Sequence, residues 1–226
     1  MPGAVLIELA LTTAATAKPY RLLVNGTDIL TGPSGRGVPV ESLSIVDAGW
    51  NTPGTLSFLY EDPILAYAMP AGALVQFVDT SKVLPAWSGF LTHRTRVPAF
   101  GDQGIAVQCS AIDGSVLLDR NLVDRSITYP AGLSDQAIFQ GLIGEFGIGM
   151  NAASPYIQMT NPSMPLMTFG DQTLRSAVEQ LCAAAQDSMT VGTERHYYVD
   201  PGFYPHYFAV ESNTAPYQVT DNWNGV

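Results

Sequence analysis

Apolar and polar residues alternate along much of the first half of the chain. Leu56, Phe58 and Tyr60 are separated by smaller or polar residues, which is the period of a strand with one buried face. Asn25-Gly26 is a typical hairpin turn, and residues 31–39 are a loop by their Gly and Pro content. Strands are predicted over residues 4–11, 20–24, 27–30, 43–45, 55–60, 73–79, 86–97 and 104–112. This spacing favours a closed or nearly closed β-barrel.

The period changes after Arg120, where helical patterns begin. Ser134 suits an N-cap, and Ile138, Leu142 and Phe146 recur every fourth residue, which predicts a helix at about 135–146. A second apolar stripe with helical spacing predicts a helix at about 173–187. Asp200-Pro201-Gly202 is the expected turn of a hairpin over residues 190–210.

These patterns predict a mainly β protein with an α+β part. Residues 1–122 are expected to form the β-barrel domain, and residues 123–212 an α+β domain with two helices and a small sheet. Residues 213–226 resemble the start of a further strand or a tail. Residues 147–168, rich in Gly, Pro, Asn and Met, are expected to be a long loop.

Composition excludes several classes of protein. Hydrophobic residues make up 46% of the 226 residues and charged residues 13%, so the chain is not disordered. A surface with so few charged residues is typical of one that neighbouring subunits cover. The net charge is −10 and no Lys/Arg cluster is interleaved with aromatics, which argues against sequence-specific nucleic-acid binding. No apolar run reaches the roughly 18 residues of a membrane span. Residues 4–11 lack a preceding basic region and include Glu8, so a strand is favoured over a secretory signal.

The possible metal ligands lack the spacing of a metal site. Cys109 and Cys182 form no CxxC motif and are interpreted as buried free thiols. His93 is isolated, whereas His196 and His206 could lie on adjacent hairpin strands, with no third ligand evident. No metal site is therefore predicted.

Motifs for cofactors and catalysis fail on their context. Residues 147–152 match G-x-G-x-x-A but follow a predicted helix instead of a strand, and residues 32–37 lack the Lys-Ser/Thr of a phosphate loop. Glu61-Asp62 lies in a turn before Pro63. The aromatics of residues 197–208 favour a core or an interface over a sugar platform. No catalytic, cofactor-binding or metal-binding residue is predicted, and the chain is not expected to be an enzyme.

Several weak motifs in a fixed order resemble those in the first part of proteins of the phage tail hub family. That family includes baseplate hubs of contractile phages, tail-associated proteins of long non-contractile phages and type VI secretion spikes. The similarity extends over roughly residues 40–210. Its motifs are Gly54-Thr55-Leu56-Ser57-Phe58, then Trp87-Ser88-Gly89-Phe90-Leu91, then Val107, Cys109, Asp113, Leu118, Arg120 and Val123, then the helix at 134–146, then the segments 173–191 and 196–208.

The resemblance implies a structural role at a tail tip. A homotrimer with two related barrels per subunit would form a pseudo-sixfold ring that closes the tail tube and adapts its symmetry to a threefold spike or fibre. The second barrel is absent or incomplete in this sequence. The implied partners are a distal tail or tail tube protein, a central spike or fibre, and a tape-measure protein. The implied location is the virion tail tip, after synthesis in the host cytoplasm.

Other functions remain open at this point. A hexameric distal-tail or tube-like ring protein differs from the hub in stoichiometry. A tail-associated cell-wall hydrolase would need a carboxylate or Cys/His site, and a glycan-binding module would use the aromatic residues. Edge strands and the loops at 26–39 and 147–168 are the expected contact regions.

Overall fold

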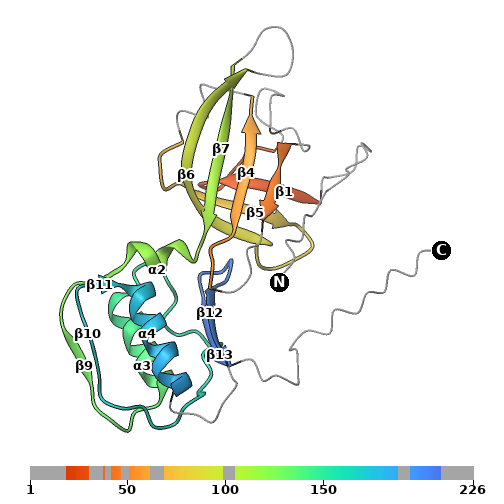
Figure 1. Cartoon of the computed structure of the whole chain (residues 1–226). Coiled ribbons are helices and arrows are strands. Elements are labelled where there is room, and N and C mark those ends of the chain that lie inside the picture. Colours follow the sequence, from red (N-terminus) through yellow and green to blue (C-terminus); the bar gives the residue numbers. More distant parts are fainter. Residues whose placement is uncertain are drawn as a thin grey trace.

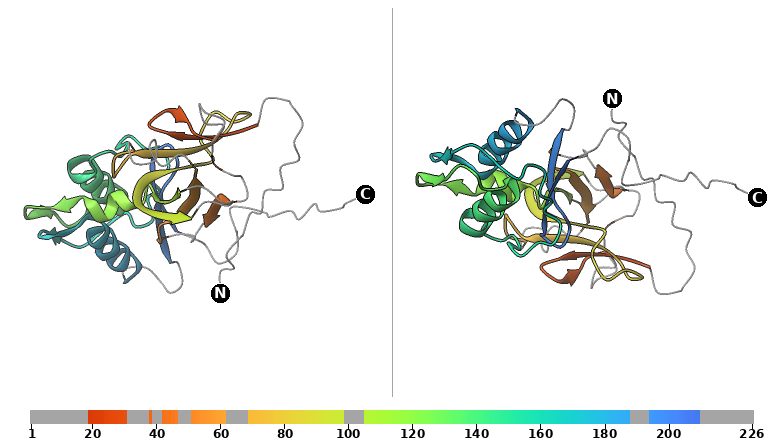
Figure 2. Two further views of the ribbon diagram at one scale, coloured as in Figure 1. Left: turned by 90° about the horizontal axis from the view of Figure 1, so that it is seen from above. Right: turned by 90° about the horizontal axis from the view of Figure 1, so that it is seen from below.

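The computed structural model describes residues 19–30, 38, 42–46, 51–61, 69–98, 105–187 and 194–209. A curled sheet occupies one end of the molecule, and helices α3 (Asp135–Phe146) and α4 (Leu174–Asp187) occupy the other (Figures 1 and 2).

Seven antiparallel strands form the sheet in the order β2-β1-β5-β6-β7-β4-β3. Their bounds are β1 Tyr20–Val24, β2 Thr27–Asp28, β3 Ser44–Val46, β4 Thr55–Tyr60, β5 Leu74–Asp79, β6 Trp87–Pro98 and β7 Ile105–Asp113. The predicted Asn25-Gly26 turn joins β1 to β2, and both residues have positive φ (48° and 80°), as this tight hairpin turn requires.

The prediction of a mainly β protein with an α+β part is confirmed. Of the closed or nearly closed barrel that the strand spacing favours, the closed form is wrong for the described residues. Strands β2 and β3 stand at opposite ends of the strand order, and among the described residues they do not pair with each other. Closure depends on pairing between strands distant in sequence, which local alternation does not encode. The strand predicted at residues 4–11 lies outside the described residues.

Strand β6 bends where its pairing changes. Its first residues lie between β5 and β7, with Phe77 opposite Trp87 and Leu74 opposite Phe90. A register shift against β7 then occurs between Leu91 and His93, which is a β-bulge. Beyond it, the described pairing of β6 is with β7 alone.

The second part contains two longer helices and short strands. Its other elements are α2 Val116–Arg120, β8 Leu122–Val123, β9 Ile127–Tyr129, β10 Met167–Phe169, β11 Gln172–Thr173, β12 Arg195–Val199 and β13 Pro205–Ala209. Helices α3 and α4 lie where helical periodicity predicts them, and Ser134 caps α3 by accepting a 3.1 Å hydrogen bond from the amide of Ala137. Helix α2 is not predicted by the sequence pattern.

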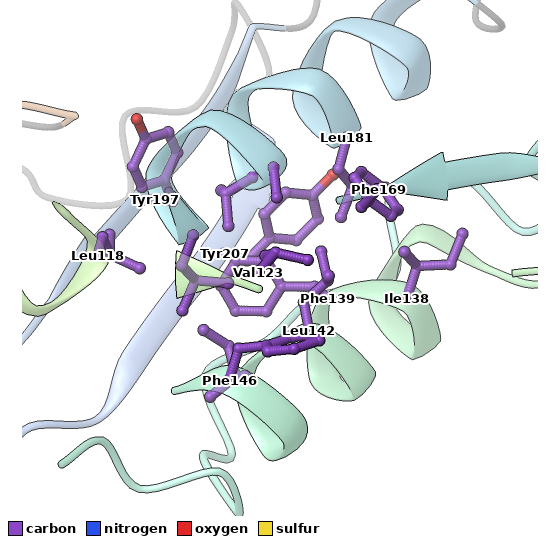
Figure 3. Close-up of a cluster of buried hydrophobic side chains, with 14 of the residues drawn as sticks. Leu118, Val123, Ile138, Phe139, Leu142, Phe146, Phe169, Leu181, Tyr197 and Tyr207 are labelled. Atoms are coloured by element: carbon purple, nitrogen blue, oxygen red, sulfur yellow. The ribbon is translucent and has the colours of Figure 1, made fainter. Parts of the chain in front are cut away.

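Each part has its own hydrophobic cluster. One lies within the sheet and includes Phe58 and Trp87. The other lies between the helices and the β12–β13 hairpin, where the rings of Phe139 and Tyr207 stack with their centroids 4.9 Å apart (Figure 3). The domain boundary at residues 122/123 stays a prediction.

A buried carboxylate organises the helical part. Asp135 in the first turn of α3 is fully buried and accepts hydrogen bonds from the backbone amides of Thr160 and Asn161, each 3.0 Å long. It also accepts one from the hydroxyl of Tyr207 at 2.9 Å. These bonds tie the 147–168 connection to the core, because a buried carboxylate is stable only when donors satisfy it. None of the helices in the described ranges has the length and apolar character needed to cross a membrane.

Candidate functional site at the junction of the sheet and the helices

The sheet meets the helical part where β7 ends and β4 begins. Asp113, the last residue of β7, accepts a 2.5 Å hydrogen bond from the amide of Gly54 and a 2.9 Å bond from the amide of Ser115. The hydroxyl of Ser115 in turn accepts from the amide of Val199 in β12 at 3.3 Å. The strand end, the start of α2 and the hairpin are thereby joined.

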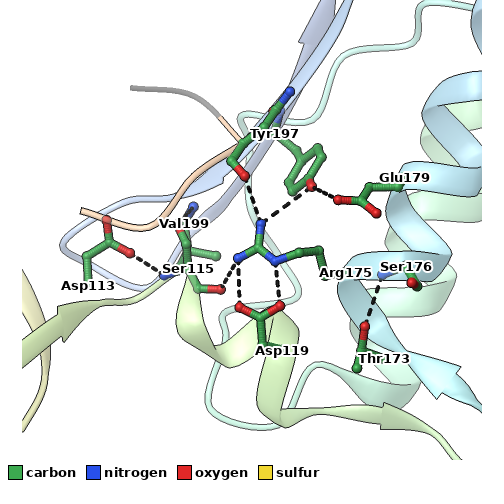
Figure 4. Close-up of polar contacts among 10 residues, drawn as sticks. Asp113, Ser115, Asp119, Thr173, Arg175, Ser176, Glu179, Tyr197 and Val199 are labelled. Atoms are coloured by element: carbon green, nitrogen blue, oxygen red, sulfur yellow. Dashed lines mark hydrogen bonds and ion pairs between the residues drawn. The ribbon is translucent and has the colours of Figure 1, made fainter. Parts of the chain in front are cut away.

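Arg175 in the first turn of α4 is the centre of this junction (Figure 4). Its Nε and Nη2 donate to the two carboxylate oxygens of Asp119, at 2.5 and 3.0 Å. Nη2 also donates to the carbonyl of Ser115 at 3.0 Å. Nη1 donates to the carbonyl of Asn51 at 3.0 Å and to the hydroxyl of Tyr197 at 3.4 Å. Each of the five N–H groups of a guanidinium therefore has an acceptor.

The surroundings of Arg175 keep it charged and Tyr197 neutral. Burial opposes the charge on the guanidinium, but the hydrogen bonds to Asp119 and Tyr197 outweigh it and raise the pKa of Arg175. Burial raises the pKa of Tyr197 to about 12, although Arg175 acts in the opposite direction. The Tyr197 hydroxyl stays protonated and donates to Glu179 of α4 at 3.1 Å.

Asn51 attaches the turn before β4 to β12. Its side-chain oxygen accepts from the amide of Tyr197 at 2.9 Å, and its own amide donates to the carbonyl of Tyr197 at 3.2 Å. Asn51 has φ of 64°, a left-handed conformation that asparagine tolerates better than most residues.

An aromatic contact forms another side of the junction. The ring of Phe90 in β6 lies 5.5 Å from the ring of Phe203 in the β12–β13 turn, and the guanidinium of Arg120 lies 5.4 Å above Phe90. Phe203 has φ of 61°, which is unusual for a bulky residue and is sustained here by packing. A Cβ at Gly114 would lie 3.1 Å from the Phe203 ring, so glycine allows the ring to pack closely against the backbone here.

The junction acts as a structural joint. Because each guanidinium donor already has a protein acceptor, Arg175 has no donor left for a ligand or a substrate anion. Its contacts instead connect the turn before β4 with α2, α4 and β12. The arrangement therefore fixes the orientation of the sheet relative to the helices.

The structure separates the three histidines into different environments. His93 on β6 lies 2.6 Å from the hydroxyl of Thr95. His206 lies 3.1 Å from the carboxylate of Asp200, and His196 lies 3.8 Å from that of Glu194. Among the described residues, no group of three or more His, Cys, Asp or Glu side chains is placed to hold a metal ion.

The aromatic residues of the hairpin stack on one another. His206 lies between Tyr156 and Tyr198, with centroid distances of 4.3 and 4.2 Å and interplanar angles of 3° and 14°. Both faces of the imidazole are therefore occupied within the protein. A sugar platform needs an open ring face, so this stack is suited to holding the 147–168 connection on the hairpin.

The other sequence candidates do not form a site. Glu61 follows β4, and Asp62 lies outside the described residues. Gly147 is the C-cap of α3, so the G-x-G-x-x-A pattern follows a helix, which is the wrong context for a dinucleotide site. Burial raises the pKa of Cys109 to about 11 and that of Cys182 to about 12, so both thiols are protonated at neutral pH.

Sequence reasoning missed the junction. Arg175 is separated from Asp119 by 56 positions and from Asn51 by 124. An arginine near a helix start is unremarkable alone, and no local pattern links it to these partners. Asp113, which belongs to one of the motifs that carry the resemblance to the tail hub family, is a junction residue that the sequence analysis does single out.

Comparison with solved structures identifies the fold. No protein-family model matches the chain, and no curated protein sequence matches it. The 43 kDa tail protein of prophage MuSo2 from Shewanella oneidensis has a TM-score of 0.52 at 10% identity, over 85% of this chain and 56% of that protein. The prophage tail protein gp18 from Listeria monocytogenes has a TM-score of 0.51 at 10% identity, over 75% of this chain and 44% of that protein.

A secretion protein shares the same architecture. The E. coli c3393 protein, a component of the type VI secretion system described as structurally similar to the T4 tail proteins gp27 and gp5, has a TM-score of 0.50 at 13% identity. The match spans 83% of this chain and 48% of that protein, so this chain spans about half the length of the proteins it matches. The resemblance to phage tail proteins that the sequence motifs predict is confirmed at the level of the fold.

Proposed function

We propose that this protein is a structural subunit of a phage tail tip or baseplate and not an enzyme. The observation that carries the proposal is a fold shared with a prophage tail protein over 85% of the chain. In its specific form, the proposal is a hub subunit that closes the tail tube and adapts sixfold to threefold symmetry. Its partners would be further copies of itself, a distal tail or tube protein, and a central spike or fibre.

The junction supports a structural role. A subunit that adapts one symmetry to another must hold its surfaces at fixed angles, because symmetry fixes which surfaces meet. The guanidinium of Arg175, whose five N–H groups all have acceptors, and the contact between the rings of Phe90 and Phe203 provide such a rigid connection. The charge-poor composition is likewise suited to a surface that other subunits cover.

The mass and symmetry of the native assembly test the proposal. Native mass spectrometry gives the number of chains, and negative-stain images give the symmetry. A threefold ring with a central hole is the expected result. A sixfold ring would favour a distal-tail or tube-like protein, and a monomer at every accessible concentration would contradict a ring-forming subunit.

Enzyme and glycan-binding functions are tested on the same preparation. Peptidoglycan and polysaccharide digestion would be assayed with the wild type and with a Glu61→Gln, Asp62→Asn, His196→Gln variant. The structural proposal expects no turnover by either protein. Turnover that the triple substitution abolishes would establish a hydrolase, and glycan binding that Tyr198→Ala abolishes would establish a binding module.

A further inference from the structure

The imidazole of His206 lies in a slot formed by the rings of Tyr156 and Tyr198 and the carboxylate of Asp200. Tyr156 and Tyr198 cover the two faces of the imidazole, with interplanar angles of only 3° and 14°. At the edge of the imidazole, Nε2 donates a hydrogen bond to Oδ2 of Asp200, which lies 3.1 Å away, because a carboxylate can only accept. The side chains of His206 and Asp200 are 15% and 13% exposed. The imidazole is therefore enclosed on both faces and at one edge.

The turn between β12 and β13 fixes the carboxylate end of the slot. Oδ1 of Asp200 accepts hydrogen bonds from the amides of Gly202 and Tyr204, at 2.8 and 2.9 Å. Burial raises the pKa of this carboxyl, but the hydrogen bonds from His206, Tyr204 and Gly202 outweigh burial and lower its pKa below the ordinary value. Asp200 is therefore ionised at neutral pH, and its charge faces the edge of the imidazole.

The two tyrosine walls of the slot are held by contacts outside it. The carbonyl of Tyr156 accepts a 3.2 Å hydrogen bond from the amide of Tyr207 in β13, and its ring lies edge-on to that of Tyr204 at a centroid distance of 6.1 Å. Tyr198 belongs to β12, and its ring lies edge-on to that of Phe208 at 6.2 Å. Neither wall depends on the imidazole for its position, so the slot should persist when the imidazole is removed.

This combination of groups favours a flat cation over a flat neutral ring. The titratable groups that face the imidazole from the described residues are Asp200 of the turn, Tyr156 of the 147–168 connection and Tyr198 of β12. The face of a tyrosine ring is electron-rich and attracts a cation that lies over it. The carboxylate adds a full negative charge at the edge, and its low exposure limits screening by solvent.

We propose that Tyr156, Tyr198 and Asp200 form a binding slot for a planar nitrogen cation, such as an imidazolium or a guanidinium, which His206 occupies within the chain. Through Tyr156, the occupant clamps the 147–168 connection onto the β12–β13 hairpin. A charged ring in the slot holds the connection more firmly than a neutral ring, which gains only the stacking contacts. This inference concerns the chain itself and does not depend on the proposed function in a phage tail.

Chemical rescue of His206→Ala tests the slot. The melting temperature of this variant is followed by circular dichroism at about pH 6, where added imidazole is mostly charged. Pyrazole, a ring of the same size that stays neutral, is the matched compound. We expect the variant to melt below the wild type and imidazole to restore part of the loss, with an affinity at least about tenfold above that of pyrazole. The wild type, whose slot is filled, should respond to neither compound.

Asp200→Asn in the His206→Ala background is the matched control variant. The side-chain oxygen of asparagine can still accept hydrogen bonds from the amides of Gly202 and Tyr204, so the turn is retained while the charge is lost. This double variant should bind imidazole no more tightly than pyrazole. A preference for imidazole that survives in the double variant would contradict the role of the carboxylate.

Hydrogen exchange in His206→Phe is a second measurement, which retains a flat ring in the slot. The amide of Gln158 donates to the carbonyl of Tyr207 at 2.8 Å, so its exchange rate reports how firmly the connection is held on the hairpin. We expect this amide to exchange at least about tenfold faster in His206→Phe than in the wild type at about pH 6. Equal rates would overturn the clamp, because stacking alone would then hold the connection.

The rescue experiment has two further outcomes that would overturn the slot. Equal restoration by imidazole and pyrazole would mean that any flat ring fills the space, without selection for charge. No restoration by either compound would mean that the walls do not form a binding slot once the imidazole is absent. Both results would leave the proposed tail function unchanged.

Discussion

Arg175 is the side chain through which the sheet and the helices are most directly connected. We predict that Arg175→Lys lowers the free energy of unfolding by about 2–3 kcal/mol. Lysine is a point charge with three donors, so it cannot replace the planar fork that reaches Asp119, Asn51 and Tyr197 together. Urea unfolding followed by circular dichroism measures the change.

Arg125→Lys is the matched control. Arg125 forms an ion pair with Glu145, but its side chain is 65% exposed, and solvent-exposed ion pairs contribute little to stability. The control should therefore unfold almost like the wild type. Similar losses in the two variants would show that the junction adds no more than a surface ion pair.

His196 should make the fold sensitive to mild acid. The residue is only 9% exposed, and its burial lowers its pKa below the usual 6.5, with Glu194 acting in the opposite direction. As the pH falls through 6.5, the unfolded chain binds a proton that the folded protein resists. Stability therefore decreases until the pH reaches the folded-state pKa.

The pH effect is measured against a variant that cannot titrate at this position. Melting temperatures of the wild type and His196→Gln would be compared between pH 7.5 and pH 5, a range of about the width over which such a histidine titrates. The wild type should lose more stability on acidification than the variant. An equal decrease in melting temperature for the wild type and His196→Gln would exclude His196 as the source of the pH dependence.

At the scale of elements, two glycines should respond to alanine in opposite directions. A Cβ at Gly89 in β6 would lie 2.1 Å from the carbonyl oxygen of Ile112 and 2.5 Å from the Trp87 ring, so Gly89→Ala must displace the β6–β7 pairing. We predict a loss of about 2 kcal/mol or more. At Gly144 in α3 a Cβ meets nothing within 4 Å, so Gly144→Ala should gain about 0.5–1 kcal/mol from helix propensity.

Thermal unfolding of both glycine variants measures these effects. Opposite shifts in melting temperature are expected. An unchanged melting temperature in Gly89→Ala would mean that strands β6 and β7 adjust easily around this position. A lower melting temperature in Gly144→Ala would mean that the surroundings of Gly144 in α3 are more crowded than the structure indicates.

Elements with local signals are the ones the sequence predicts well. Ser134 as an N-cap and the recurrence of Ile138, Leu142 and Phe146 at every fourth position predict helix α3. The dipeptide Asn25-Gly26 predicts the β1–β2 turn. Helix α2 has only five residues, too few to show a helical period. The sequence pattern also does not predict that β2 and β3 end the strand order of the sheet in the described residues, because this depends on which distant strands pair.

The junction was unpredictable for the same physical reason. The acceptors of Arg175 come from the turn before β4, from α2 and from β12, and only the folded chain brings them together. The Tyr156–His206–Tyr198 stack is a partial exception, since the sequence shows an aromatic-rich hairpin. The sequence did not show that these rings would occupy one another's faces.

At the scale of the whole molecule, the balance between acidic repulsion and apolar contact should control assembly. The chain carries 20 acidic and 10 basic residues, so copies of the chain repel one another as they come together. Salt shortens the screening length from about 10 Å at 0.1 M to about 3 Å at 1 M. Apolar contacts between copies are not screened in this way. We therefore predict that assembly strengthens as sodium chloride is raised between these concentrations.

Sedimentation velocity at several salt concentrations, with the protein concentration fixed, measures this balance. The assembled fraction of the wild type should rise with salt. Assembly that weakens with salt would mean that ion pairs hold the copies together. Acidic repulsion would then be the wrong description of what opposes assembly.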